Sequence, residues 1–370
     1  MLDDHKVAFI TCVNDETEYA ECRHYLERLR VPDGYAVEIM SIREAPSMTA
    51  GYQAAMKDSD AKYKVYLHQD VFIINRRFIE DMLAVFACDK KIGILGVIGK
   101  KEIKCTLQDM LKVLDTGKVI YNNMVMSGIQ PEEGSCTEVM MADGLLLATQ
   151  YDIPWREDIL DGWDFYDVSQ CVEFRKAGYK VSIPDQKDIW CCHDGVCLEM
   201  LHFFDQYKKF RREYACVFGC SAEMDQEERM FCEKNKYYAQ KRRKLKEGIA
   251  ALIAVGDRDG VRRIFQNAEL QKDQYLSAQY LMEYRDIVSI DEIEERAQAP
   301  VRFWQYGMTV QQLILKLHIL KYALKRMEYG AEDAETIRIL EGYSQYAIKE
   351  VCSRYVAYRG HVLQKLKAMF

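Results

Sequence analysis

Three polar segments of this 370-residue chain directly follow short apolar runs, at the positions where strands end and ligands bind in open α/β sheets. They are residues 11–15 (Thr-Cys-Val-Asn-Asp), 68–70 (His-Gln-Asp) and 190–195 (Trp-Cys-Cys-His-Asp-Gly). The carboxylate of Asp70 is expected at the rim of a sheet, where it can bind a divalent cation that also takes diphosphate oxygens. His193 could supply a nitrogen ligand to the same ion, which would shift the preference from Mg²⁺ toward Mn²⁺.

Each of these residues also has a simpler structural explanation. A lone aspartate after a strand usually caps a helix or closes a turn, and taken singly Asp70 is better explained that way. Asp164 and Asp167 are three residues apart, one turn of a beginning helix, so both could face one cleft. One of the two could instead cap that helix.

The cysteines around His193 raise the alternative of a structural zinc site formed with Cys191, Cys192 and Cys197. Adjacent cysteines rarely bind one ion together, and no second Cys-X-X-Cys pair accompanies them, so zinc is disfavoured. The 13 cysteines are odd in number and irregularly spaced in a long chain, which argues against a disulfide framework. We therefore expect reduced thiols and a cytoplasmic protein.

The first 200 residues alternate strand and helix patterns, which predicts an α/β fold with a mostly parallel sheet flanked by helices. Strands are predicted over 7–12, 36–42, 63–67, 92–98 and 180–183, and helices over 16–30, 50–56, 76–88 and 166–177. Residues 100–138 have weaker periodicity and are interpreted as an excursion over the sheet. Helical patterns alone follow, over 200–217, 223–255, 271–284, 310–327 and 332–369. We therefore predict two domains, 1–200 and an all-α domain over 201–370.

The charge of the chain is unevenly distributed. Residues 1–200 carry 34 acidic and 22 basic side chains, whereas the remainder is mildly basic, and the chain totals −7. The basic clusters 208–212 and 241–244 are usually explained as solvated helix faces. Peripheral contact with an anionic membrane and a docking role, including homo-oligomerisation, stay open, whereas nucleic-acid binding is not expected. No apolar run is long enough for a membrane helix, and no signal peptide is expected.

The order of several motifs resembles the family 2 glycosyltransferases, which have the GT-A fold. Residues 7–14 (Val-Ala-Phe-Ile-Thr-Cys-Val-Asn) are similar to the opening strand of that family. Residues 51–56 and 64–70 resemble its helix, strand and metal-binding Asp-X-Asp motif. Residues 161–167 and 172–179 are similar to its Glu-Asp acceptor motif and the following Arg-X-X-Gly. The resemblance covers about residues 5–198.

This resemblance implies metal-dependent transfer of a sugar, with inversion, from a nucleotide-diphosphate donor to an acceptor hydroxyl. The donor would be a UDP-sugar, and the acceptor a glycan, a lipid-linked molecule or a protein. Asp70 and His193 would hold Mn²⁺ or Mg²⁺ against the leaving diphosphate, and Asp167 would be the general base with Asp164 in reserve. The resemblance also places seven residues near the donor: Thr11, Cys12, Asn14, Arg43, Gln53, Gln69 and Asp143. For Asp143, a tight turn with Gly144 is an equal alternative.

The sequence departs from the family pattern at three positions. His68 stands in place of the first Asp of Asp-X-Asp, Tyr166 in place of the Glu of Glu-Asp, and Gln53 where Asn is frequent. A divergent subfamily would show such changes, and so would an inert module that binds a glycan or a partner. The first is preferred because Asp70, Asp167 and His193 are retained. A nucleotidyltransferase is disfavoured because its Gly-rich basic loop is missing.

Overall fold

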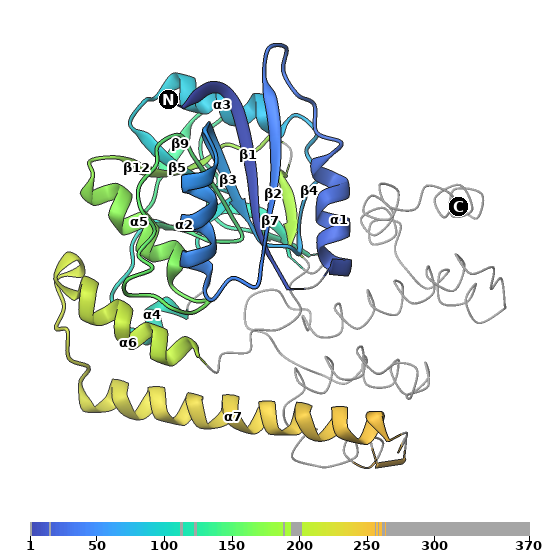
Figure 1. Cartoon of the computed structure of the whole chain (residues 1–370). Coiled ribbons are helices and arrows are strands. Elements are labelled where there is room, and N and C mark those ends of the chain that lie inside the picture. Colours follow the sequence, from blue (N-terminus) through green and yellow to red (C-terminus); the bar gives the residue numbers. More distant parts are fainter. Residues whose placement is uncertain are drawn as a thin grey trace. The chain divides into compact units, whose positions relative to one another are not determined.

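The computed structural model describes residues 2–263 except 15, 112–113, 122–123, 188, 194–201, 256, 258 and 261–262 (Figure 1). Residues 1–195 and 199–237 group into one compact unit, and residues 196–198 and 238–370 into another. The helices predicted over 271–284, 310–327 and 332–369 lie outside the described residues.

The main sheet of the first unit has seven strands in the order β2-β1-β3-β11-β5-β12-β9. Strand β1 is parallel to both β2 and β3, whereas β11 is antiparallel to its neighbours β3 and β5. The predicted strands are confirmed with small changes of boundary. The bounds are β1 (Asp3–Val13), β2 (Ala36–Arg43), β3 (Ala61–Leu67), β5 (Ile92–Gly96), β9 (Cys136–Glu138), β11 (Leu146–Thr149) and β12 (Lys180–Pro184).

A second sheet has the order β10-β6-β7-β13-β4, with β8 paired to β7. The strand predicted over 92–98 is divided, because after Val97 the chain leaves β5 and pairs in this second sheet. The excursion over 100–138 contains α4 (Leu107–Met110) and several of the short strands. The bounds are β4 (Val71–Ile73), β6 (Ile98–Lys100), β7 (Thr116–Tyr121), β8 (Met124–Ser127), β10 (Met141–Ala142) and β13 (Cys191–His193).

Helices cover both faces of the main sheet, and successive side chains of β1 contact helices on opposite faces. Ala8 and Ile10 belong to the core formed with α2 (Met48–Asp58) and α5 (Tyr166–Lys176), whereas Phe9 faces Phe78 of α3 (Phe78–Cys88). This alternation is the period-two pattern of a strand buried on both sides. Helix α1 (Glu16–Leu26) packs beside β4 through Tyr25 and Phe72, whose rings are stacked. The helical patterns predicted in this half are confirmed.

Close contact between α2 and the end of β1 depends on Gly51. A Cβ atom at this position would come 2.6 Å from the sulfur of Cys12. Ser47 caps the helix, since its side chain accepts a hydrogen bond from the backbone N–H of Ala50 at 3.1 Å. The start of α2 is therefore fixed against the strand end that leads to the site.

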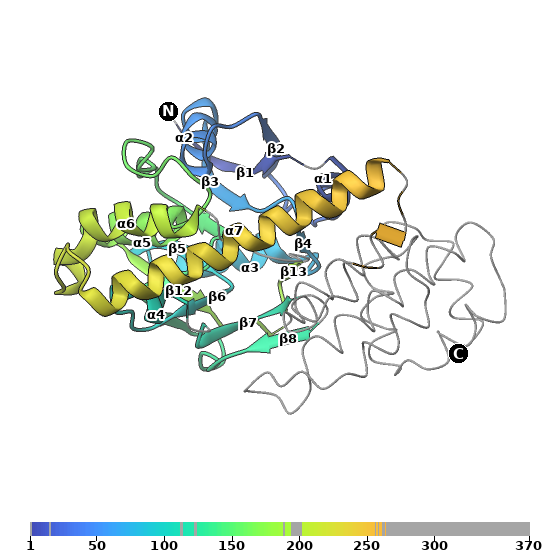
Figure 2. The same ribbon diagram turned by 90° about the horizontal axis from the view of Figure 1, so that it is seen from below.

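Residues beyond 200, as far as Tyr237, still belong to the first unit. Helix α6 (Phe203–Tyr214) covers α5 with an aromatic face, and the short helix η1 (Ala215–Phe218) and α7 (Gln226–Ala254) follow (Figure 2). The face consists of Phe204, Tyr207, Phe210 and Tyr214, all of them buried. The compact unit thus extends to Tyr237, past the boundary predicted near residue 200.

The basic cluster 208–212 is only partly solvated. The Arg211 guanidinium is buried and pairs with Glu228 of α7, and Lys209 pairs with Asp161 at 2.5 Å. Part of the positive charge thus joins α6 to its neighbours. No helix within the described residues combines the length and apolar character that crossing a membrane requires.

Candidate functional site

The candidate site forms where β1 and β3 end beside each other. Asn14 follows β1, and Gln69 follows β3. The Asn14 backbone N–H donates to Gln69 Oε1 at 2.8 Å, and Gln69 Nε2 donates to Asn14 Oδ1 at 2.5 Å. Parallel pairing thus brings the two predicted polar segments together, at the edge where ligands bind in α/β sheets.

Asp70 lies in a cluster with His68 and His193, whose ligand atoms are all within 4.8 Å of one another. Asp70 Oδ1 is 3.3 Å from His193 Nε2 and 3.9 Å from His68 Nδ1. Antiparallel pairing of β13 with β4 places His193 opposite Val71, next to Asp70. The predicted partners Asp70 and His193 are therefore brought together, and the structure adds His68.

The charges of this cluster suit a cation. Burial alone would raise the pKa of Asp70, but the hydrogen bond from His193 and the nearby imidazoles leave the pKa below its ordinary value. Burial lowers the pKa of His68, which favours the neutral imidazole that can bind a metal. One carboxylate and two imidazoles fit Mn²⁺ better than Mg²⁺, which prefers oxygen ligands. Metal binding by these residues stays a prediction.

The carboxylate of Asp167, the predicted general base, lies half-buried in the first turn of α5. Its Oδ2 accepts a hydrogen bond from the backbone N–H of Gly144 at 3.0 Å. Burial, reinforced by the negative charge of Asp143, raises the pKa of Asp167 to about 7. A carboxylate with that pKa can take up or release a proton near neutral pH.

The segment formed by Asp143, Gly144 and Leu145 connects the cluster to Asp167. The Leu145 carbonyl accepts a hydrogen bond from the His68 N–H at 3.1 Å, while Gly144 donates to Asp167. Asp143 Oδ1 accepts from the Leu145 N–H at 2.9 Å, which supports the tight-turn interpretation of this residue. A contact of Asp143 with a donor sugar stays a prediction. The metal cluster and the candidate base therefore share one rim.

Asp164 is not on the same helix as Asp167, contrary to the assumption that both lie on one helical turn. Helix α5 begins at Tyr166, and Phe165 before it has the left-handed φ of 64°. Such a backbone angle is unfavourable for a bulky residue and is held here by the buried aromatic cluster around Phe165. Burial raises the pKa of Asp164 to about 6. Its role as reserve base stays a prediction.

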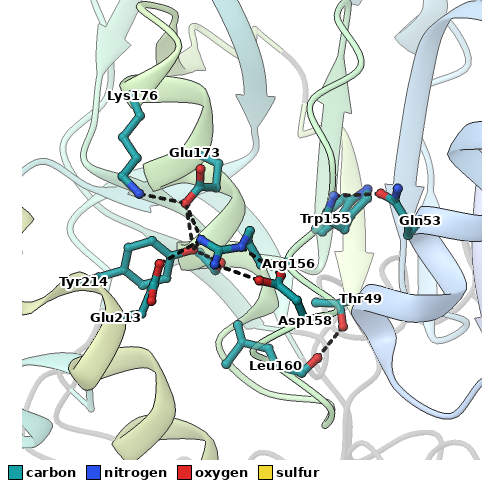
Figure 3. Close-up of polar contacts among 11 residues, drawn as sticks. Thr49, Gln53, Trp155, Arg156, Asp158, Leu160, Glu173, Lys176, Glu213 and Tyr214 are labelled. Atoms are coloured by element: carbon teal, nitrogen blue, oxygen red, sulfur yellow. Dashed lines mark hydrogen bonds and ion pairs between the residues drawn. The ribbon is translucent and has the colours of Figure 1, made fainter.

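Two residues assigned to the donor are bonded to other parts of the protein. The buried Gln53 of α2 accepts a hydrogen bond from the Trp155 N–H at 2.8 Å (Figure 3). Arg43 Nε and Nη2 donate to the Glu16 carboxylate at 2.6 and 3.0 Å. A nucleotide contact through the Arg43 guanidinium, which stays a prediction, would have to compete with Glu16.

The side chains of Thr11 and Cys12 are buried. The Thr11 hydroxyl has no hydrogen-bond partner within the described part of the chain, and burial raises the pKa of the Cys12 thiol to about 12. Cys12 faces α2 and is an unreactive packing residue. Any contact of these two residues with a donor, which is untested, would therefore involve their backbone.

The other chemical candidates around β13 belong to the core. Cys191 and Cys192 are buried, and Trp190 lies edge-on against Phe78. Cys197, which the zinc alternative needs, lies outside the described residues. Trp163 is 44% exposed and remains available for stacking on a sugar.

The sequence matches the model of a family described as "Glycosyltransferase like family" over residues 8–214. This match covers more than half of the chain, and the chain therefore belongs to that family. The matched range contains all the candidate site residues named above. No curated protein matches the chain significantly.

Two solved structures are similar to this chain at low scores. S. aureus TarS 1–349 is 9% identical, with a TM-score of 0.37, over 95% of this chain and 89% of that one. The mannosyltransferase PcManGT from Pyrobaculum calidifontis, in complex with GDP-Man and Mn²⁺, is 10% identical, with a TM-score of 0.38, over 84% and 85%. Similarity at this level carries no argument about the fold or the activity of this chain. The family and the observed sheet confirm the predicted GT-A-like class, while most of the predicted all-α domain lies outside the described residues.

Proposed function

We propose that this chain transfers a sugar from a nucleotide-diphosphate donor to an acceptor hydroxyl, with a divalent metal at Asp70 and His193. The observation that carries this proposal is the shared rim, where residues 143–145 hydrogen-bond both to His68 of the metal cluster and to Asp167. A glycosyl transfer with a diphosphate leaving group is assisted by a cation at the leaving group and a proton acceptor at the attacking hydroxyl.

In this proposal each group has a separate task. Mn²⁺ held by Asp70 and His193 would neutralise the charge that develops on the leaving diphosphate. Asp167 accepts the proton of the attacking hydroxyl, because its pKa of about 7 leaves a large ionised fraction at neutral pH. By family resemblance the donor is a UDP-sugar and the transfer inverts the anomeric centre. The acceptor is a glycan, a lipid-linked molecule or a protein.

The experiment is a donor screen that measures release of the nucleoside diphosphate from UDP- and GDP-sugars, with Mn²⁺ and with a chelator. Asp70→Asn should abolish both transfer and slow donor hydrolysis while the thermal unfolding curve stays cooperative. Asp89→Asn is the matched control, since Asp89 is a carboxylate paired with Lys180 at 2.8 Å and lies outside the candidate site. Full activity of Asp70→Asn, or of the wild type in chelator, would contradict the metal role.

The alternative, an inert module that binds a glycan or a partner, predicts a different outcome of a simpler measurement. A nucleotide-sugar enzyme should be stabilised by UDP with Mn²⁺, because a ligand that binds the folded state raises the unfolding temperature. If neither UDP nor GDP has such an effect, with or without Mn²⁺, the binding module becomes the better description.

A further inference from the structure

The two main departures from the family pattern contact each other. His68 Nε2 and the Tyr166 hydroxyl are hydrogen-bonded, although the two residues are 98 positions apart in the chain. With Nε2 engaged by Tyr166, the other ring nitrogen, Nδ1, is the one that lies 3.9 Å from Asp70 Oδ1. The imidazole of His68 is therefore held between Tyr166 on one side and the carboxylate of the metal cluster on the other.

We propose that His68 is a third metal ligand, that it binds through Nδ1, and that Tyr166 is the residue that orients it. A neutral imidazole carries one proton, so an Nε2–H that donates to the Tyr166 hydroxyl leaves the Nδ1 lone pair free for a cation. Hydrogen bonding of the second ring nitrogen is the usual way in which proteins orient a histidine ligand. This inference rests on the metal role proposed above and extends it by two residues.

Tyr166 is well placed to act as a positioning residue because its ring is firmly held. It is 4% exposed and lies against the rings of Tyr52 and Trp155, with centroid distances of 5.9 and 6.2 Å. Its hydroxyl lies so close to Gly144 that a Cβ atom there would collide with it. The backbone of residues 143–145 therefore approaches both Tyr166 and His68, and the hydroxyl has little freedom to move.

A third ligand from His68 has a consequence for metal choice. Asp70, His193 and His68 supply one carboxylate oxygen and two imidazole nitrogens. Imidazole suits transition metals, whereas Mg²⁺ prefers oxygen ligands and retains its water. The chain should therefore bind Mn²⁺ much better than Mg²⁺, and His68→Asp should reduce that difference.

The test is Mn²⁺ binding by the full chain, followed through the electron paramagnetic resonance signal of the free ion. Pulsed measurements with ¹⁵N-labelled histidine count the coordinated nitrogens. We expect two in the wild type and one in His68→Ala. Tyr166→Phe keeps the ring and should weaken Mn²⁺ binding about tenfold or more, the usual cost of losing such an outer partner. Tyr52→Phe is the control, since it removes a buried hydroxyl that bonds the Leu67 carbonyl in the same aromatic cluster.

The outcomes separate this inference from the proposed function. If Mn²⁺ binding depends on Asp70 but shows one nitrogen in the wild type and in His68→Ala, the third ligand is wrong and the metal role stands. If the wild type binds no Mn²⁺, the metal role and the inference are both wrong. If His68→Ala does not fold, Tyr166→Phe decides, because unchanged affinity in that variant would overturn the positioning role.

Discussion

Asp167 is a carboxylate whose pKa the fold raises to about 7, through burial and the nearby charge of Asp143. A general base must be ionised, so kcat/KM should rise with pH through about 7 and level off above it. Asp143→Asn removes a negative neighbour and should move this rise to lower pH. The pH profile of donor turnover checks both expectations.

The same profile distinguishes Asp167 from Asp164, whose pKa is raised to about 6. Loss of a positioned general base lowers rates by about 10²–10⁴-fold. We expect Asp167→Asn to show such a loss above about pH 7, where the wild-type base is ionised, and to lack the rise near that pH. Asp164→Asn should retain the rise near 7. The reverse result would assign the base to Asp164.

The raised pKa of Asp167 also predicts how stability depends on pH. The unfolded value is about 3.9, so the folded protein binds the proton more tightly, and stability falls as pH rises from about 4 through about 7. Each pKa unit corresponds to about 1.4 kcal/mol, and the cost at pH 8 is a few kcal/mol. Asp167→Asn should therefore raise the free energy of unfolding relative to the wild type at pH 8 and much less at pH 4. Equal effects at both values would contradict this assignment.

At the scale of elements, the segment before α5 is held from several sides (Figure 3). Thr49 and Gln53 of α2 hydrogen-bond the backbone at Leu160 and Trp155, at 2.5 and 2.8 Å. Arg156 Nη1 lies 3.2 Å from Glu173 of α5 and 3.0 Å from Glu213 of α6. This network joins three helices around the chain that leads to Asp164 and Asp167.

We expect Arg156→Ala to lower the free energy of unfolding by about 1–3 kcal/mol, because it removes one of the two cations, Arg156 and Lys176, that pair with the largely buried Glu173. Arg23→Ala is the control, since Arg23 of α1 forms an exposed pair with Glu27, which directly follows the helix. Such pairs contribute about 0.5 kcal/mol or less. Urea unfolding measures the free energy of unfolding of both variants. Similar small decreases in the two would show that the network contributes no more to stability than an exposed ion pair does.

The strand ends carrying Asn14 and Asp70 were predictable because an apolar run followed by a polar residue marks the rim of a parallel sheet. His68 was missed as a member of the cluster, and was noted only as a departure from a motif. Its contacts depend on Tyr166, far away in the sequence, and no local pattern specifies such a pairing. Gln53 illustrates the opposite case: the family resemblance placed it near the donor, and its side chain also bonds the Trp155 backbone, which no pattern in the sequence indicated.

At the scale of the whole molecule, the contacts of α6 bear on the boundary predicted near residue 200. A change from mixed to purely helical patterns indicated a new domain, yet α6 packs on α5 and belongs to the same compact unit. Helical periodicity reports that a face is buried but does not reveal which element covers it. The aromatic residues of α6 were visible in the sequence, and their partners Phe165 and Val172 could not be identified from it.

This arrangement predicts the result of shortening the chain. A chain ending at residue 200 lacks Tyr207, Phe210 and the rest of the aromatic face of α6. Loss of one buried aromatic side chain costs about 3–5 kcal/mol, and a whole domain is stable by only about 5–15 kcal/mol. That chain should therefore not fold cooperatively. A chain ending at Tyr237 retains α6 and the buried Arg211–Glu228 pair, and should unfold cooperatively and bind Mn²⁺. Circular dichroism melting of the two chains is the measurement, and cooperative unfolding of the shorter one would show that the domain ends near residue 200.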